Sequence, residues 1–194
     1  MPRRPSPPPA AFLFFGVFSG RLDIIDDVRT LVEERYGPLH PRGESPVFPF
    51  PETQSYPKTM GSDLKKRFYV LDKRWPQDGL ARVKRDAVEM EAALGDRWRK
   101  RAGVDRPVNI DPGLINDCRI ILATTKDYAH RLYRGEGIWE EITLVYRQGQ
   151  YRELPWTYRD FKSPEYHRFF EIFREEFLTN APPRGPRPDA PRRA

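Results

Sequence analysis

The apolar run Ala-Ala-Phe-Leu-Phe-Phe-Gly-Val-Phe at residues 10–18 gives the clearest indication of how this chain folds. A short apolar run that ends at a turn, here Ser19-Gly20, is typical of a strand buried on both faces. The run also has the length of the apolar region of a secretory signal, but five prolines precede it and no Ala-x-Ala cleavage site follows. We therefore predict a buried first strand. No segment reaches the ~18 apolar residues that a membrane-spanning helix needs, so we expect no membrane contact.

The spacing of apolar and turn residues predicts the elements that follow this strand. Helices are expected over residues 23–36, 78–94 and from 164 onward, with Gly37-Pro38 and Gly95 ending the first two and Ser163-Pro164 starting the third. Strands are expected over residues 66–71, 108–111, 119–124, 139–147 and 150–154, with an edge strand or extended loop at 47–50. Turns are predicted at Asp111-Pro112-Gly113 and Gln148-Gly149, and a loop over residues 38–46. Residues 124–133 fit a helix or a strand equally well.

The first six elements run strand, helix, strand, strand, helix, strand, which matches a ferredoxin-like β-α-β-β-α-β layout. We predict an α+β fold with this core, extended by a β-hairpin and a C-terminal helix, with the helices on one face of the sheet. An α/β three-layer arrangement is the alternative. A single globular domain is expected at residues 11–180. Residues 1–10 and 181–194 are expected to be disordered Pro/Arg-rich tails, because they hold 10 of the 21 prolines.

The net charge of +6 lies mostly in these tails. Residues 1–10 carry +2 and residues 181–194 carry +3, which leaves +1 on the rest of the chain. A large face for nucleic-acid phosphates is therefore not indicated. The only cysteine, Cys118, excludes an internal disulfide and a multi-cysteine metal site. We expect it to be a buried structural thiol, which suits a reducing compartment.

Polar and ionisable residues crowd between short apolar strands over residues 108–161, more densely than packing requires. The candidate site residues are Asn109, Asp111, Lys126, His130, Arg131, Trp156, Tyr158 and Asp160. These residue types suit a phosphate-bearing ligand such as a nucleotide or an RNA end. Lys126 and Arg131 would hold phosphate oxygens, Arg131 as a bidentate fork.

Catalytic roles can be assigned to two of these residues. His130 could act as a general acid or base, and Asp111 could orient His130 or hold Mg²⁺ through water. Asp111 and Asp160 could also form a carboxylate pair. Trp156 or Tyr158 could stack on a base, and Asn109 shares a strand face with Asp111.

Six of the eight candidates also have a structural alternative. Asp111 could serve only the Asp-Pro-Gly turn, and His130 could satisfy a core hydrogen bond. The remaining alternatives are pairing of Lys126 and Arg131 with Asp127 and Glu141, and packing of Trp156 and Tyr158.

Several segments carry a resemblance to a known family: Met60–Phe68, Val108–Gly113, Leu122–Arg131 and Leu154–Asp160. Their combination resembles the signatures of a bacterial family called domain of unknown function 4416, over residues 10–175. The resemblance implies a cytoplasmic single-domain protein and no particular reaction, because the family is uncharacterised. The chain departs from the family pattern at Arg159, where proline is usual, and at Lys58-Thr59, where an acidic residue is usual nearby.

The sequence lacks the common signatures of nucleotide sites and hydrolases. It contains no Gly-x-x-x-x-Gly-Lys-Ser/Thr, no Gly-x-Gly-x-x-Gly, no Gly-x-Ser-x-Gly and no His-Glu-x-x-His. We expect a phosphate-ligand site of another kind, and the residues leave open whether it is catalytic. The alternative is a non-enzymatic interaction domain that docks through the hairpin and the segment Leu-Pro-Trp-Thr-Tyr at 154–158.

Overall fold

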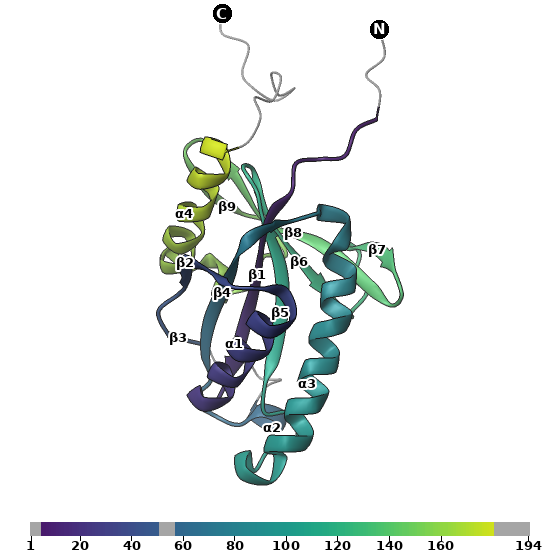
Figure 1. The fold of residues 1–194 in the computed structure, drawn as a ribbon, viewed down its shortest axis with the longest axis vertical. Helices are drawn as coiled ribbons and strands as arrows, with labels where there is room; N and C mark the ends of the chain where they lie inside the picture. The colour runs from purple at the N-terminus through teal and green to yellow at the C-terminus, as the bar shows by residue number, and fades with distance from the viewer. Residues whose placement is uncertain (1–4, 51–56, 181–194) are drawn as a thin grey trace, which may run out of the picture.

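The computed structural model describes residues 5–50 and 57–180, which Figure 1 shows as a ribbon. Within this part of the chain, nine strands form one sheet in the order β2-β4-β1-β5-β6-β8-β7, with β3 paired to β4 and β9 to β8. The strands are β1 (Ala11–Ser19), β2 (Leu39–Glu44), β3 (Phe48–Pro49), β4 (Lys65–Trp75), β5 (Asn109–Ile115), β6 (Arg119–Thr124), β7 (Leu132–Gly135), β8 (Ile138–Arg147) and β9 (Gln150–Glu153). The helices are α1 (Leu22–Tyr36), α2 (Pro57–Met60), α3 (Leu80–Ala102) and α4 (Pro164–Asn180).

Strand β1 lies at the centre of the sheet, between β4 and β5. Every one of its residues is buried, so the prediction of a buried first strand is confirmed. Because successive side chains of a strand point to opposite faces, β1 contributes to two cores. Phe14 packs against Phe170 of α4, whereas Phe15 packs against Tyr36 of α1.

Helices cover both faces of the sheet (Figure 1). On one face α1 and α3 pack together, and the indole N–H of Trp98 in α3 donates to Asp27 of α1 at 2.8 Å. On the other face α4 buries an aromatic stripe that consists of Tyr166, Phe169, Phe170, Phe173 and Phe177. The expectation that all helices share one face is therefore wrong, because this stripe occupies a sheet face of its own.

The α+β class is confirmed, but the ferredoxin-like topology is not. A β-α-β unit joins parallel strands through a crossover helix, whereas every strand pair in this sheet is antiparallel. The predicted hairpin is confirmed as β8 and β9. Its turn residues Gln148 and Gly149 have φ angles of 52° and 78°, as two-residue hairpin turns require.

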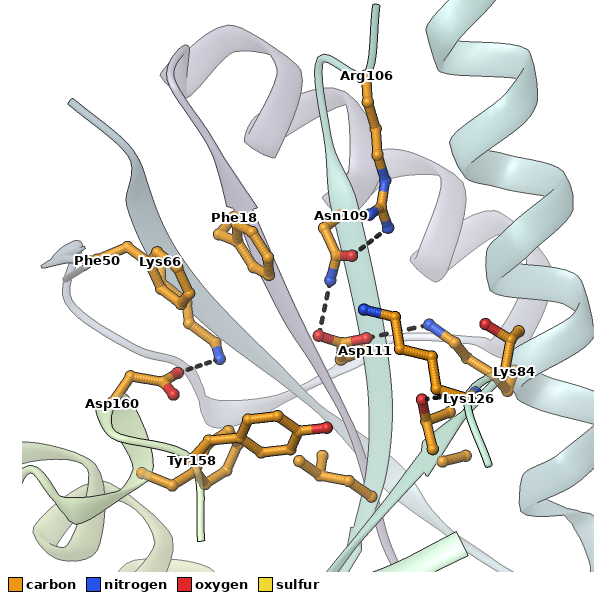
Figure 2. A pocket seen from close by; sticks show the side chains of 15 residues that line it. Phe18, Phe50, Lys66, Lys84, Arg106, Asn109, Asp111, Lys126, Tyr158 and Asp160 are labelled. Carbon is orange, nitrogen blue, oxygen red and sulfur yellow. Dashed lines mark hydrogen bonds and ion pairs between the residues drawn. The ribbon is translucent and has the colours of Figure 1, made fainter. Parts of the chain in front are cut away.

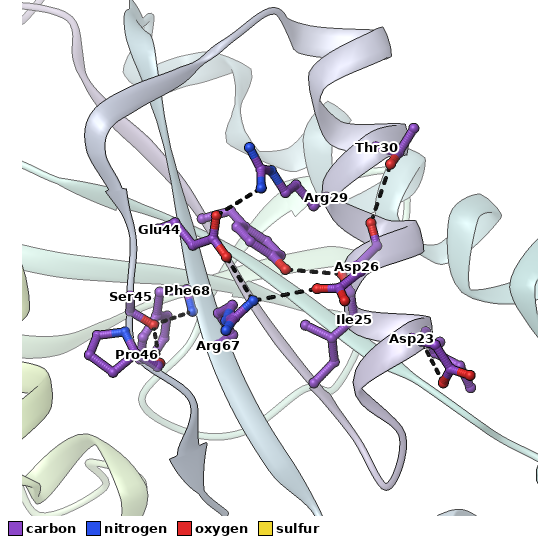
Figure 3. Close-up of polar contacts among 12 residues, drawn as sticks. Asp23, Ile25, Asp26, Arg29, Thr30, Glu44, Ser45, Pro46, Arg67 and Phe68 are labelled. Atoms are coloured by element: carbon purple, nitrogen blue, oxygen red, sulfur yellow. Dashed lines mark hydrogen bonds and ion pairs between the residues drawn. The ribbon is translucent and has the colours of Figure 1, made fainter.

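Residues 38–46 contain strand β2 rather than the predicted loop. The strand pairs irregularly with β4, and side chains reinforce the attachment (Figure 3). The Arg67 guanidinium lies 2.7 Å from Glu44 and 3.4 Å from Asp26 of α1. The Ser45 hydroxyl accepts the Phe68 N–H at 2.9 Å. These contacts join segments that are distant in the sequence, so local composition could not reveal them.

Helix α3 continues past Gly95, where the sequence predicted its end, to Ala102. Glycine inside a helix costs about 1 kcal/mol relative to alanine. Burial of Trp98 one turn later, with its bond to Asp27, outweighs that cost. The helix stops at Gly103, whose φ of 66° suits the left-handed cap.

The predicted turn at Asp111-Pro112-Gly113 is wrong, because β5 runs straight through these residues. Strand β6 pairs with β5 only from Gly113 onward, so the missing N–H of Pro112 lies where β5 has a neighbour on one side alone. A Cβ at Gly113 would overlap the Ile121 carbonyl and the Phe14 ring. The glycine therefore permits a close approach of the β6 backbone and of the Phe14 ring to β5, rather than a turn.

Residues 125–131 form a loop, and the short strand β7 follows at Leu132. The Thr124 hydroxyl accepts the Lys126 N–H at 3.2 Å, which starts a turn instead of a helix. The disorder predicted for residues 181–194 and for the first four residues concerns positions outside the described ranges. Among the helices that the structure describes, none is both long enough and apolar enough to cross a membrane.

Candidate ligand-binding pocket

A pocket of about 130 Å³ lies where the ends of β1, β4, β5 and β6 meet the segment 158–161 (Figure 2). Its charged lining residues are Lys66, Lys84, Arg106, Asp111, Lys126 and Asp160. Its other lining residues include Phe18, Phe50, Asn109, Thr124, Thr125, Tyr158 and Phe161. Strand register explains the assembly, because Phe18 at the end of β1 pairs with Lys66 on one side and with Asn109 on the other.

A buried ion pair forms one wall of the pocket. The Lys66 Nζ lies 2.6 Å from the Asp160 Oδ2, and the two side chains are only 3% and 7% exposed. Aromatic rings surround the ammonium, and the ring centroid of Phe161 is 4.6 Å away. Each of these two charges stabilises the other, because removal of either one would leave the other buried without a counter-charge.

A second lysine-carboxylate pair forms the opposite wall. The Lys84 ammonium on α3 donates to Asp111 Oδ1 at 3.0 Å and to the Ile110 carbonyl at 2.7 Å. The Asn109 amide donates to the other Asp111 oxygen at 2.6 Å, and Arg106 donates to Asn109 in turn. Glu91 lies behind this wall, 2.8 Å from Arg106 and 3.8 Å from Lys84.

The charges around Asp111 control its protonation. Burial would raise the pKa of this carboxyl, but Lys84 and Lys66, with hydrogen bonds from Lys84 and Asn109, outweigh burial and hold the pKa below its usual value. Asp111 is therefore ionised at neutral pH. A carboxylate with a lowered pKa is a weak base.

Asp111→Asn should lower the free energy of unfolding at pH 7 by about 1 kcal/mol, the difference between a charge-assisted and a neutral hydrogen bond. A lowered folded-state pKa stabilises the protein above the unfolded-state pKa, about 3.9, and this contribution is lost as the pH falls through the folded-state value. The deficit should therefore shrink in acid. Urea denaturation at pH 7 and below pH 4 measures it, with the exposed Asp105→Asn as the control. If the loss of unfolding free energy in Asp111→Asn became larger in acid, the ion pair between Lys84 and Asp111 would be contradicted.

Lys126 differs from the other cations of the pocket. Lys66, Lys84 and Arg106 each have a carboxylate within 4 Å. No hydrogen bond or ion pair reaches the Lys126 ammonium from any residue that the structure describes. Figure 2 shows its side chain extending into the pocket toward Asp111 and Asn109. The pocket therefore presents one positive charge that is available to an anion.

The structure gathers some of the predicted site residues and separates others. Those that line the pocket are Asn109, Asp111, Lys126, Tyr158 and Asp160. His130, Arg131 and Trp156 lie beside the pocket rather than in its wall. The proposed contact of Asp111 with His130 is not formed, because Asp111 binds Lys84 and Asn109 while His130 lies 3.0 Å from Glu141. Asp111 and Asp160 each pair with a lysine and not with one another.

The Arg131 guanidinium is engaged by protein groups. Its Nε lies 2.8 Å from Glu141, and the two side chains are 4% and 1% exposed. Its other guanidinium nitrogens donate to the Lys126 carbonyl at 2.8 Å and to the Tyr158 hydroxyl at 2.5 Å. Pairing with Glu141, the structural alternative for Arg131, is thus confirmed. Arg131 fixes the position of two residues that do line the pocket.

His130 belongs to a group of rings that we call the aromatic stack: Tyr128, His130 and Trp156. The His130 ring lies nearly parallel to Trp156, with 5.0 Å between centroids and an interplanar angle of 12°. Tyr128 lies on the same ring at 6.1 Å and 19°. The Trp156 N–H donates to the Ile142 carbonyl at 2.9 Å, which fixes the indole.

Sequence reasoning missed Lys66, Lys84 and Arg106. Two of them carried a signal, because Lys66 shares a strand face with Phe68 and Val70 by alternation. Lys84 follows Leu80 by four residues and so lies on the apolar face of α3. A charged residue on an apolar face indicates a buried partner or a site. Arg106 stands in a loop and gave no such signal.

The described residues provide little for a metal ion held by protein groups alone. No cluster of three or more histidine, cysteine, aspartate or glutamate side chains with suitable placement occurs among them. Both oxygens of Asp111, the residue considered for Mg²⁺, already accept hydrogen bonds. Mg²⁺ at this position stays a hypothesis that would require ligands from a bound phosphate.

The fold and the pocket define a class of protein: an antiparallel α+β domain with a small cation-lined pocket at one end of its central strands. The family described as Domain of unknown function (DUF4416) matches residues 9–177. The chain belongs to this family. The same comparisons found no match among curated proteins and none among solved structures.

Proposed function

We propose that the pocket binds a phosphate-bearing ligand, such as a nucleotide or the end of an RNA. The observation that carries this proposal is the ammonium of Lys126, which has no partner among the described residues and extends into a pocket lined by three further cations. A phosphate oxygen would give Lys126 the counter-charge that the described residues do not supply. The amide of Asn109 and the hydroxyls of Thr124 and Thr125 line the same pocket and are chemically suited to phosphate oxygens.

Binding is better supported than catalysis. The pKa of Asp111 is held low, which makes it a weak base. Asp160 is engaged by Lys66 at 2.6 Å. His130, the predicted acid or base, does not line the pocket and shares a buried carboxylate with Arg131. A cytoplasmic location, which the single cysteine of the chain suits, is part of the proposal.

Lys126→Ala should abolish most of the affinity for orthophosphate and for ribose 5-phosphate without unfolding the protein, because Lys126 is exposed and makes no side-chain bond that the fold needs. In the full-length chain, a ligand at ~100 times its dissociation constant adds about 2.7 kcal/mol of stability. That increment should raise the melting temperature by roughly 5–10 °C in a chain of this size. Thermal unfolding with and without each compound measures the shift.

The control is Lys73→Ala, which removes an exposed lysine of β4 outside the pocket. This variant has the same net charge as Lys126→Ala. A difference between the two variants in the ligand-induced melting-temperature shift therefore reflects the position of the lysine and not the net charge. The proposal would be overturned if the phosphate compounds raised the melting temperature equally in Lys126→Ala and Lys73→Ala. It would also be overturned if no phosphate compound raised the melting temperature of the wild type. The second result would leave the docking alternative as the next to test.

A further inference from the structure

Exposed aromatic side chains gather beside the pocket. Tyr128 is 58% exposed, Trp156 38% and Tyr158 39%, although large aromatic residues usually bury their rings. Tyr128 and Trp156 flank His130 in the aromatic stack, while Tyr158 lines the pocket itself. The aromatic stack comes from residues 124–131 and 154–158, and the same two segments contribute Thr124, Thr125, Lys126 and Tyr158 to the pocket.

A single side chain connects the stack to the pocket. The guanidinium carbon of Arg131 lies 4.7 Å from the ring centroid of Tyr128. The same guanidinium donates to the Tyr158 hydroxyl and to the Lys126 carbonyl, both of which belong to pocket residues. The aromatic stack therefore adjoins the end of the pocket where Lys126 stands. Because Arg131 is itself held by buried Glu141, this arrangement is preorganised.

The size of the pocket limits what it can enclose. Pockets that bury a whole drug-sized ligand measure about 300–1,000 Å³, and this one measures about 130 Å³. It can enclose a phosphoryl group and part of a sugar. Any larger ligand must extend outward, and the aromatic stack adjoins the pocket beside Lys126, where it could meet the rest of the ligand.

We propose that a nucleobase stacks on the exposed ring of Tyr128, at the end of the aromatic stack, while its phosphate binds Lys126 in the pocket. The ligand class is then a nucleoside monophosphate or a phosphate-terminated single strand, which share this chemistry. The inference rests on the proposed function and gives its ligand a second recognition element. Charge favours a nucleic-acid unit over a peptide, because the rings border an unpaired cation and a nucleotide presents an anion and a flat ring together.

The test compares four probes on the full chain by isothermal titration calorimetry: orthophosphate, ribose 5-phosphate, adenosine 5′-monophosphate, and a 5′-phosphorylated single-stranded tetranucleotide. The adenosine compound should bind between about fivefold and a hundredfold more tightly than ribose 5-phosphate, the range expected for stacking of one base. Tyr128→Leu should remove that gain while leaving the affinity for ribose 5-phosphate unchanged. Tyr128→Phe keeps the ring and should keep the gain.

The control is Tyr133→Leu, because Tyr133 is as exposed as Tyr128 but packs against Trp139, outside the aromatic stack. It should bind all four probes as the wild type does. A tetranucleotide that binds more tightly than the monophosphate supports a strand end as the source, and equal affinities support a free nucleotide.

Two further outcomes separate the inference from the function on which it rests. If ribose 5-phosphate binds and adenosine 5′-monophosphate binds no more tightly, the stacking inference is overturned and the phosphate site stands. The same holds if Tyr128→Leu keeps the full gain. If no probe binds, the proposed function fails, and the inference fails with it.

Discussion

Asp160→Leu should lower the free energy of unfolding by about 3–5 kcal/mol, because it leaves the Lys66 ammonium buried without its counter-charge. The two groups lie 2.6 Å apart, with almost no exposure to solvent. The ring of Phe161 can attract the ammonium but cannot accept its protons as a carboxylate does. Urea denaturation measured by circular dichroism gives the change directly.

The double variant Lys66→Met with Asp160→Leu should recover most of this loss, because apolar residues of similar volume often replace a buried ion pair without cost. The matched surface control is Glu153→Gln, which breaks the exposed pair of Glu153 with Lys162. It should cost less than about 1 kcal/mol. If Asp160→Leu lowered the free energy of unfolding no more than Glu153→Gln does, water would have to reach Lys66, contrary to the burial described above.

Glu141→Leu should destabilise the protein by a similar amount, about 3–5 kcal/mol, because Arg131 is also buried. Glu141→Gln keeps an oxygen that can accept from Arg131 and should cost less. It should nevertheless weaken phosphate binding, since Arg131 would hold Lys126 and Tyr158 less firmly. Unfolding and phosphate titration of the same variants measure the two effects separately.

Asp96→Asn provides the control for Glu141, because it neutralises one end of an exposed ion pair with Arg99 on α3. It should change neither stability nor phosphate affinity appreciably. Full phosphate affinity in folded Glu141→Gln would show that the loop of Lys126 needs no support from Arg131. The role assigned to Arg131 would then be wrong.

The parts of this fold that could be predicted are those in which local pattern and tertiary structure agree. The apolar run of β1, the aromatic stripe of α4 and the Gln148-Gly149 hairpin all belong to this group. Asp111-Pro112-Gly113 misled the prediction because its turn chemistry is local, whereas its strand conformation depends on where β6 begins to pair. Gly95 led to a wrong prediction of where α3 ends for a similar reason, since Trp98 beyond it bonds to Asp27 on another helix.

The pocket was predictable only in part, for the same physical reason. Its β5 and loop residues stand out by composition, as Asn109, Asp111 and Lys126 show. Lys66 meets Asp160 across 94 positions of the chain. No local rule specifies such a distant pairing. The contacts of His130 and Arg131 with Glu141 were not predicted as a pair, because Glu141 looked like an ordinary polar position of β8.

The strands β2 and β7, at the two ends of the main strand order, have a consequence for how the protein behaves in concentrated solution. Strand β2 contains Pro41 and pairs irregularly, and β7 at the opposite edge has four residues. A regular edge strand offers a row of unpaired backbone groups to a neighbouring molecule, and short, kinked or proline-containing edges remove that template. The long inner strands β1 and β4 are thus shielded from edge-to-edge pairing. We therefore expect these edges to disfavour aggregation through strand pairing.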